Sequence, residues 1–262
     1  METRIISLTN NKGGVGKTTS TLNIGVGLAN KGRRVLLVDL DPQASLTISL
    51  GLNSKDYLER SIVQVLTKTK DIKECIFKIR ENVYIIPSNK LLNDAEDVIK
   101  GKPFRESILK KAIEPIKDIF NYILIDCPPS LNVFTDNGLT ASSEVFLPIE
   151  AEYLALQGTS QLVEKVNEMK EGNEELKITG VFLTKYDQRK NLNKQVKEVL
   201  EATFKNTVFN TNINTNVAIA EAPSHQKDIF SYEPTSTGAK DYENLVEEII
   251  AQEQGGINEK EK

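Results

Sequence analysis

The feature that most constrains this chain is the segment Lys-Gly-Gly-Val-Gly-Lys-Thr-Thr at residues 12–19. It follows an apolar run, Arg4–Asn10, that predicts a strand, and it leads into Lys17–Asn30, which predicts a helix. Its glycines allow a tight bend that turns backbone N–H groups toward a phosphate. The helix that follows adds the positive end of its dipole. Because a phosphate-binding loop needs this strand–loop–helix context, the segment predicts a nucleotide site.

The remainder of the chain repeats the alternation of strands and helices. Further strands are expected at Arg34–Asp39, Val83–Ile86, Asn121–Asp126, Glu144–Ile149, Ile178–Thr184 and Thr207–Asn210. Helices are expected at Ser107–Phe120, which Pro115 should kink or divide, and at Gln157–Lys170, Asn191–Phe204 and Tyr242–Glu253. This alternation predicts an α/β fold in which helices cover both faces of a mostly parallel, twisted sheet. We expect one domain over residues 1–253 and a polar, flexible tail over residues 254–262.

Composition excludes several classes of protein. The 262 residues carry a net charge of -4, so binding to nucleic acid would need a local basic patch. No apolar run has the length of a membrane-spanning helix, and the N-terminus does not resemble a signal peptide, so a cytoplasmic protein is expected. The two cysteines, Cys75 and Cys127, are too far apart in sequence for a CxxC site, and one histidine excludes a multi-histidine metal site.

Three side chains of the loop have the chemistry that a nucleoside triphosphate requires. Lys17 can reach the β- and γ-phosphates, and the hydroxyl of Thr18 can bind Mg²⁺. Thr19 can donate a hydrogen bond near the α-phosphate. ATP and Mg²⁺ are therefore the expected ligands.

Carboxylates follow two of the predicted buried strands. Asp39 and Asp41 lie in the segment VDLDPQ, and Asp126 ends the run YILID. Near a phosphate site, such groups can hold Mg²⁺ or orient an attacking water molecule. For Asp41, capping of the next helix is an alternative. Cys127, which follows Asp126, is expected to be a small buried side chain.

The loop differs from the common pattern G-x-x-x-x-G-K-[ST], because Asn11 occupies the first glycine position and Lys12 precedes the double glycine. In this it resembles the deviant Walker A ATPases, P-loop proteins that include the ParA and Soj partition ATPases, MinD and the nitrogenase iron protein. The segments DLDPQ and DCPP and the segment EAPS at residues 221–224 extend the resemblance to Soj-type proteins over nearly the whole chain.

The resemblance implies roles for particular residues. Lys12 would reach across a dimer interface to the partner's nucleotide and act in catalysis with Lys17 and Asp41, which positions the water. Asp126 would bind Mg²⁺ with Thr18, and Asp39 would bind it or support that site. The expected nucleotide contacts are Lys12, Gly13, Gly14, Val15, Gly16, Lys17, Thr18 and Thr19 of the loop, with Thr184 near the adenine.

The resemblance also implies partners: a second copy of the chain in an ATP-dependent homodimer, a ParB-like protein that stimulates slow hydrolysis, and non-specific DNA on the nucleoid. Arginines that precede EAPS in Soj-type proteins are replaced here by Thr215 and Ala218. A replacement patch is expected from Lys185, Arg189, Lys190, Lys194 and Lys197, whose alternative is a solvated helix face.

Three other functions fit parts of the sequence. A MinD-like membrane protein would need a basic amphipathic C-terminal helix, and residues 242–262 instead contain many acidic side chains. An iron–sulfur carrier would need a cysteine motif, which the chain lacks. A nucleotide-switched regulatory protein that acts through protein partners cannot be separated from a partition ATPase by sequence alone.

Overall fold

The fold is built on one seven-stranded sheet with the strand order β3-β4-β2-β5-β1-β6-β7. The structure, a computed structural model, describes residues 2–152 and 155–260. The strands are β1 (Arg4–Leu8), β2 (Val35–Asp39), β3 (Phe77–Arg80), β4 (Val83–Ile86), β5 (Tyr122–Asp126), β6 (Glu144–Glu150) and β7 (Lys177–Thr184). All neighbouring pairs are parallel except β3 and β4, which are antiparallel. The predicted α/β class and mostly parallel sheet are confirmed.

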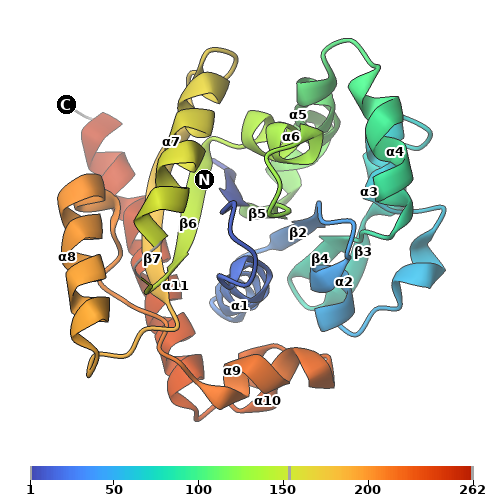
Figure 1. The fold of residues 1–262 in the computed structure, drawn as a ribbon. Helices are drawn as coiled ribbons and strands as arrows, with labels where there is room; N and C mark the ends of the chain where they lie inside the picture. The colour runs from blue at the N-terminus through green and yellow to red at the C-terminus, as the bar shows by residue number, and fades with distance from the viewer. Residues whose placement is uncertain (1, 153–154, 261–262) are drawn as a thin grey trace.

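Helices cover both faces of this sheet (Figure 1). The α-helices are α1 (Lys17–Asn30), α2 (Ser45–Ser49), α3 (Ile62–Thr67), α4 (Leu91–Lys100), α5 (Ile108–Ile113), α6 (Val133–Ala141), α7 (Ala155–Lys170), α8 (Asn191–Phe204), α9 (Val217–Glu221), α10 (Ile229–Tyr232) and α11 (Thr237–Lys260). The 3₁₀-helices are η1 (Ser54–Tyr57), η2 (Ile72–Cys75), η3 (Arg105–Ser107), η4 (Glu114–Ile119), η5 (Lys205–Thr207) and η6 (Ala222–His225). Among these helices, none is both long enough and apolar enough to cross a membrane.

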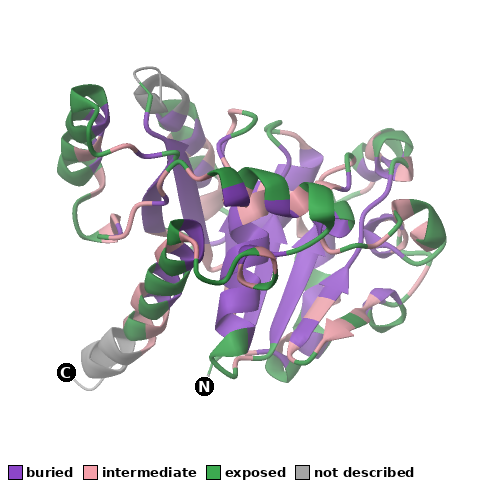
Figure 2. Ribbon diagram, turned by 90° about the horizontal axis from the view of Figure 1, so that it is seen from below, coloured by how far each residue is buried: buried purple, intermediate pink, exposed green. Residues whose placement is uncertain are grey.

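Alternate residues of each strand enter different cores. In β5, Leu124 packs with α1 and α11 on one face, whereas Ile123 and Ile125 pack with α3 to α6 on the other. The second face continues over β6 and β7, where α7 and α8 provide the cover. The central strands are therefore buried on both sides (Figure 2), as their continuous apolar sequences predict.

The structure agrees with most predicted elements and corrects one. Lys17–Asn30, Val83–Ile86 and Asn191–Phe204 have the predicted bounds. The helix expected at Ser107–Phe120 is divided, as its proline suggested, into η3, α5 and η4. The strand expected at Thr207–Asn210 is wrong, because only one residue of it, Val208, forms a single isolated bridge to β7.

The C-terminal helix is longer than its apolar stripe suggests. We expected a helix over Tyr242–Glu253, and α11 begins at Thr237 and continues to Lys260. The flexible tail expected over residues 254–262 stays a prediction, and its last two residues lie outside the described part of the chain.

Candidate functional site

The loop between β1 and α1 is shaped by two glycines in the left-handed region. Gly14 has a φ angle of 77° and Gly16 one of 88°, a conformation that costs glycine little and other residues more. Gly16 occupies the N-cap position of α1, and no side chain caps this helix. The first turn of α1 contains no acidic residue. Its free N–H groups and its dipole therefore favour an anion at this point.

Lys17 is held inside this loop. Its Nζ donates a hydrogen bond of 3.0 Å to the carbonyl oxygen of Lys12, so the amine closes the loop on itself. Burial lowers the pKa of Lys17, against the opposing attraction of Asp126. A phosphate oxygen can replace the carbonyl as the acceptor and would favour the charged form of the amine.

The predicted metal-binding side chains meet at the end of β5. Thr18 Oγ1 donates to Asp126 Oδ2 at 2.7 Å, and Thr21 Oγ1 lies 3.3 Å from Asp126 Oδ1. Burial, followed by repulsion from Asp39, raises the pKa of Asp126 well above its usual value. The Thr18 hydroxyl keeps free lone pairs while it donates its proton. A hydroxyl and a buried carboxylate that lacks a full counter-charge suit Mg²⁺, which prefers hard oxygen ligands.

Asp39 is adjacent to Asp126 across the sheet but has a different set of partners. The two residues pair in the parallel register of β2 and β5. One oxygen of Asp39 accepts from the backbone N–H of Asp41, and the other accepts from the N–H and the hydroxyl of Thr47. Burial raises the pKa of Asp39 to about 7. These bonds tie Asp39 to the loop that holds Asp41, and its expected role as a metal ligand or as support for that site stays a prediction.

A cavity of about 560 Å³ opens above the loop. Its lining contains seven predicted site residues: Gly13, Gly14, Gly16, Lys17, Thr18, Thr19 and Asp41. The other lining residues come from α2, from the segment after β5 and from the EAPS segment: Ser45, Ile48, Ser49, Pro129, Pro223 and Ser224. The structure thus places Asp41 opposite the phosphate loop, where its Oδ1 also accepts from the N–H of Gln43. Lys12, Val15, Thr184, Asp39 and Asp126 do not line the cavity.

Lys12 is held by two carboxylates that the sequence analysis did not identify. Its Nζ lies 2.9 Å from Glu150 Oε2 and 2.7 Å from Glu152 Oε2. The hydrogen bonds that Lys12 donates to Glu152 and Glu150 raise the pKa of Lys12. Glu150 also binds Lys185 at 2.9 Å. Although burial opposes it, the hydrogen bonds from Lys185 and Lys12 keep the pKa of Glu150 below its usual value. The sequence did contain a signal for Glu150, because this residue stands at the carboxyl end of β6. The loop after β1 lies at the same edge of the sheet, where ligands of such folds bind.

Two predicted nucleotide contacts, Val15 and Thr184, have buried side chains. The side chain of Val15 is buried, so only its backbone can face a ligand. Thr184, at the end of β7, is also buried, and its Oγ1 donates to the carbonyl oxygen of Val15 at 2.9 Å. The hydrogen bond from Thr184 therefore supports the shape of the loop. The contact of Thr184 with adenine stays a prediction, and the burial of this side chain does not favour it.

The basic patch expected near α8 is partly neutralised. Lys185 pairs with Glu150, and Arg189 forms a two-pronged contact with Asp187 at 2.9 Å. Lys197 lies 3.8 Å from a carboxylate of its own helix. Within the described residues, Lys190 and Lys194 form no ion pair. The patch therefore offers fewer free cations than the sequence suggests.

Three further predictions concern Thr215, Ala218 and Cys127. Thr215 is exposed, whereas Ala218 is buried, so only the first marks a surface position for a DNA contact. Cys127 is fully buried as expected, and burial raises the pKa of its thiol to about 12. Such a thiol is protonated and unreactive at neutral pH.

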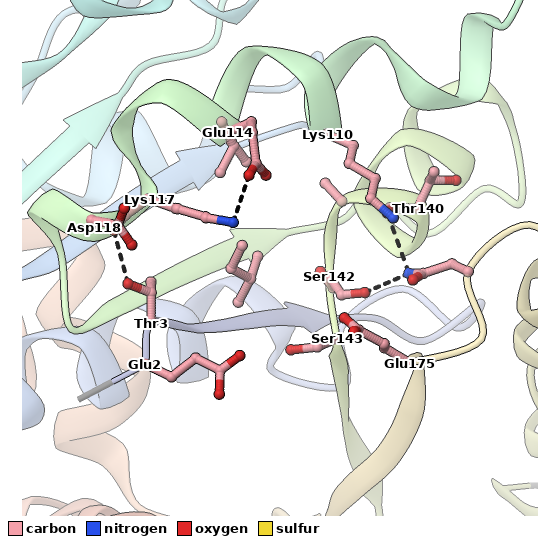
Figure 3. A pocket seen from close by; sticks show the side chains of 14 residues that line it. Glu2, Thr3, Lys110, Glu114, Lys117, Asp118, Thr140, Ser142, Ser143 and Glu175 are labelled. Atoms are coloured by element: carbon pink, nitrogen blue, oxygen red, sulfur yellow. Dashed lines mark hydrogen bonds and ion pairs between the residues drawn. The ribbon is translucent and has the colours of Figure 1, made fainter.

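A second, smaller cavity of about 140 Å³ lies at the opposite edge of the sheet, near the amino ends of β1 and β6 (Figure 3). Polar groups in its wall bond to one another. Thr3 Oγ1 donates to the carbonyl oxygens of Lys117 and Phe120, and Lys117 pairs with Glu114 at 2.6 Å. This cavity shares no residue with the phosphate loop.

Comparisons with known proteins agree with this geometry. Residues 3–178 match the family described as AAA domain. The chain is 44% identical over 250 residues to the sporulation initiation inhibitor protein Soj of Bacillus subtilis, covering 95% of this chain and 98% of that protein. It is 40% identical over 250 residues to the chromosome-partitioning ATPase Soj of Treponema pallidum, covering 93% and 96%. A crystal structure of cobyrinic acid a,c-diamide synthase from Mycobacterium smegmatis with ADP and magnesium is 33% identical, with a TM-score of 0.84 and coverage of 97% and 96%.

Proposed function

Because this chain belongs to the Soj and ParA family of partition ATPases, we propose that it is a Mg²⁺-dependent DNA-segregation ATPase. The observation that carries this proposal is the convergence of Lys17, Thr18 and Asp41 on one cavity, beside the buried Asp126. We assign residues 1–253 to the ATPase domain and residues 254–262 to a tail. We infer action in the cytoplasm, on DNA of the nucleoid.

The loop residues bind and orient ATP. Lys17 exchanges the carbonyl oxygen of Lys12 for the β- and γ-phosphates, and the N–H groups of Gly13 to Thr19 surround the phosphate chain. Thr18 and Asp126 would hold Mg²⁺, and the bound ion would supply positive charge next to the phosphate oxygens. Asp41, supported through Asp39, positions the attacking water molecule.

Assembly of two subunits completes the site. Lys12 leaves Glu150 and Glu152 and reaches the nucleotide of the partner subunit, where its charge stabilises the transition state. Because a single subunit lacks this second cation, we expect its hydrolysis of ATP to be slow. A ParB-like partner would accelerate hydrolysis and return the dimer to single subunits. The ATP-bound dimer binds DNA without sequence preference.

The proposal is tested by light scattering with ATP, ADP and no nucleotide. We expect the wild type to form dimers only with ATP, and Lys12→Ala to bind ATP but remain monomeric. Wild-type-like dimers of this variant would refute the role of Lys12. An absence of ATP binding by the wild type would refute the nucleotide site itself.

A second candidate is a nucleotide switch that acts through proteins rather than DNA. The observation in its favour is the neutralisation of Lys185 and Arg189 by neighbouring carboxylates. Fluorescence anisotropy with labelled duplex DNA separates the two. ATP-dependent binding that weakens with salt supports the partition ATPase, and no binding under any nucleotide condition supports the switch.

A further inference from the structure

Two segments that are distant in sequence concentrate positive charge in an otherwise acidic chain. Residues 67–75 and 100–111 together contain eight lysines and arginines and three carboxylates, although the whole chain has a net charge of -4. The remaining residues are therefore more acidic than the total suggests. Such an asymmetry creates a local positive potential that the net charge conceals.

The fold brings these segments side by side. A groove of about 500 Å³ between the end of α3, η2 and α5 has Lys68, Lys70 and Lys111 in its lining, together with the carboxylates of Asp71 and Glu74. Lys102 extends to the same place, because its Nζ donates to the carbonyl oxygen of Thr67. These four lysines define a surface that we call the α3–α5 basic face. It shares no residue with the nucleotide cavity.

Two of the four amines are available to a ligand. Lys68 and Lys111 are exposed, and within the described residues neither forms an ion pair. The amine of Lys111 lies 5.2 Å from the ring centroid of Phe104, which is itself exposed. Lys70 is only loosely paired, at 3.8 Å from a carboxylate of Glu74. Exposed pairs of this length contribute little, so this amine can also change partner.

The floor of the groove indicates what kind of ligand fits. Its apolar side chains Val65, Ile72 and Ile108 are each at most 3% exposed. These three residues offer little apolar area, and the more exposed apolar side chains are those of Pro115 in the lining and Phe104 beside Lys111. Long, exposed lysine side chains instead suit a ligand recognised by charge, and phosphodiester groups at regular spacing are such a ligand.

We propose that the α3–α5 basic face binds the phosphate backbone of duplex DNA, as a second contact surface beside the region of α8. The proposal rests on the proposed function, in which the ATP-bound dimer binds DNA. It accounts for a DNA-binding surface in a chain whose Thr215 and Ala218 are uncharged and whose α8 patch is partly neutralised.

The test compares matched variants by fluorescence anisotropy, with ATP and a labelled duplex of about two helical turns. Lys68→Gln/Lys111→Gln removes both free charges of the face, and Lys68→Arg/Lys111→Arg keeps them. Lys78→Gln/Lys177→Gln removes two exposed charges elsewhere. ATP binding and ATP-dependent dimerisation are measured for each variant, to establish that folding and assembly are intact.

We expect the glutamine variant of the face to bind roughly ten- to a hundredfold more weakly at about 0.1 M salt, with the slope of log K against log salt reduced by about two. The arginine variant and the Lys78/Lys177 control should bind as the wild type does. If the wild type binds DNA and the glutamine variant keeps its affinity and slope, the inference is overturned while the proposed function stands. The same result combined with lost stimulation by a ParB-like partner overturns it in favour of a protein ligand. If the wild type binds no DNA with ATP, the DNA-binding part of the proposed function fails.

Discussion

Replacing Glu152 by glutamine should strengthen the ATP-bound dimer. In the single subunit, Lys12 Nζ is 2.7 Å from Glu152 Oε2 and 2.9 Å from Glu150 Oε2. If Lys12 must reach the nucleotide of a second subunit, these contacts are broken each time a dimer forms. Removing the charge of Glu152 lowers that cost and leaves the phosphate loop unchanged.

The magnitude follows from the exposure of the pair. The side chains of Lys12 and Glu152 are 41% and 55% exposed, so water screens their attraction. An exposed ion pair contributes about 0.5 to 1 kcal/mol. Two subunits release one such pair each, which makes the total about 1 to 2 kcal/mol, or roughly a five- to thirtyfold lower dimer dissociation constant. Glu150 is only 11% exposed and also binds Lys185, so it is the less suitable position for this test.

Sedimentation equilibrium with ATP measures the effect, in an Asp41→Ala background that prevents turnover during the run. Glu171→Gln provides a control, because it removes an exposed carboxylate at the far end of α7. The reasoning is refuted if Glu152→Gln dimerises no more tightly than this control. Weaker dimerisation would show that Glu152 contributes to the interface itself.

Further predictions concern the phosphate loop, the buried carboxylates and the core. Lys17→Ala should abolish ATP binding in calorimetry, because no other amine in the described cavity lining can replace it. Asp41→Ala should bind ATP and remain dimeric without phosphate release, and brisk turnover in a phosphate-release assay would contradict its role. Burial raises the pKa of Asp39 to about 7, which is above its value in the unfolded chain. The protonated side chain therefore contributes stability at low pH, and this contribution is lost as pH rises through about 7. The melting temperature of the nucleotide-free protein should therefore fall less between pH 5 and 8 in Asp39→Asn than in the wild type. Gly180→Ala should reduce the free energy of unfolding by about 1 to 3 kcal/mol in urea denaturation, because the added Cβ would lie 2.5 Å from the ring of Phe146.

The sequence predicted several of the elements whose pattern is set by local interactions. The apolar runs of β2 and β5 are recognisable because both faces are buried, and α1 begins at the residue that follows the last loop glycine. By contrast, α6 was missed because its residues VFTDNGLTA include poor helix formers, and it is fixed mainly by burial against the sheet. The edge strand β3 was missed because it has four residues and only half-buried apolar side chains. Neither element has a strong local signal.

The same distinction applies to the site. Spacing in the sequence identified the residues that line the cavity, because one loop holds most of them. It did not reveal which groups hold Lys12, since Glu150 and Glu152 come from a strand end far along the chain. Nor could it show that Asp39 accepts hydrogen bonds from Asp41 and Thr47, a fact that depends on how the loop after β2 folds. Contacts between distant segments are determined by the tertiary structure.

Those distant contacts suggest how nucleotide binding would control the proposed dimer. Lys12 is restrained at two points: its carbonyl oxygen accepts from Lys17, and its amine is held by Glu150 and Glu152. In the proposed ATP-bound state, a phosphate that draws Lys17 toward itself would weaken the first restraint. In the proposed dimer, the triphosphate of the second subunit would offer the amine of Lys12 a stronger anion than the two carboxylates. ADP satisfies Lys17 but presents less charge to Lys12, so the loop can be occupied without favouring the dimer. On this reasoning, the proposed dependence of the dimer on ATP would arise from competition between the γ-phosphate and the chain's own carboxylates, Glu150 and Glu152, for Lys12.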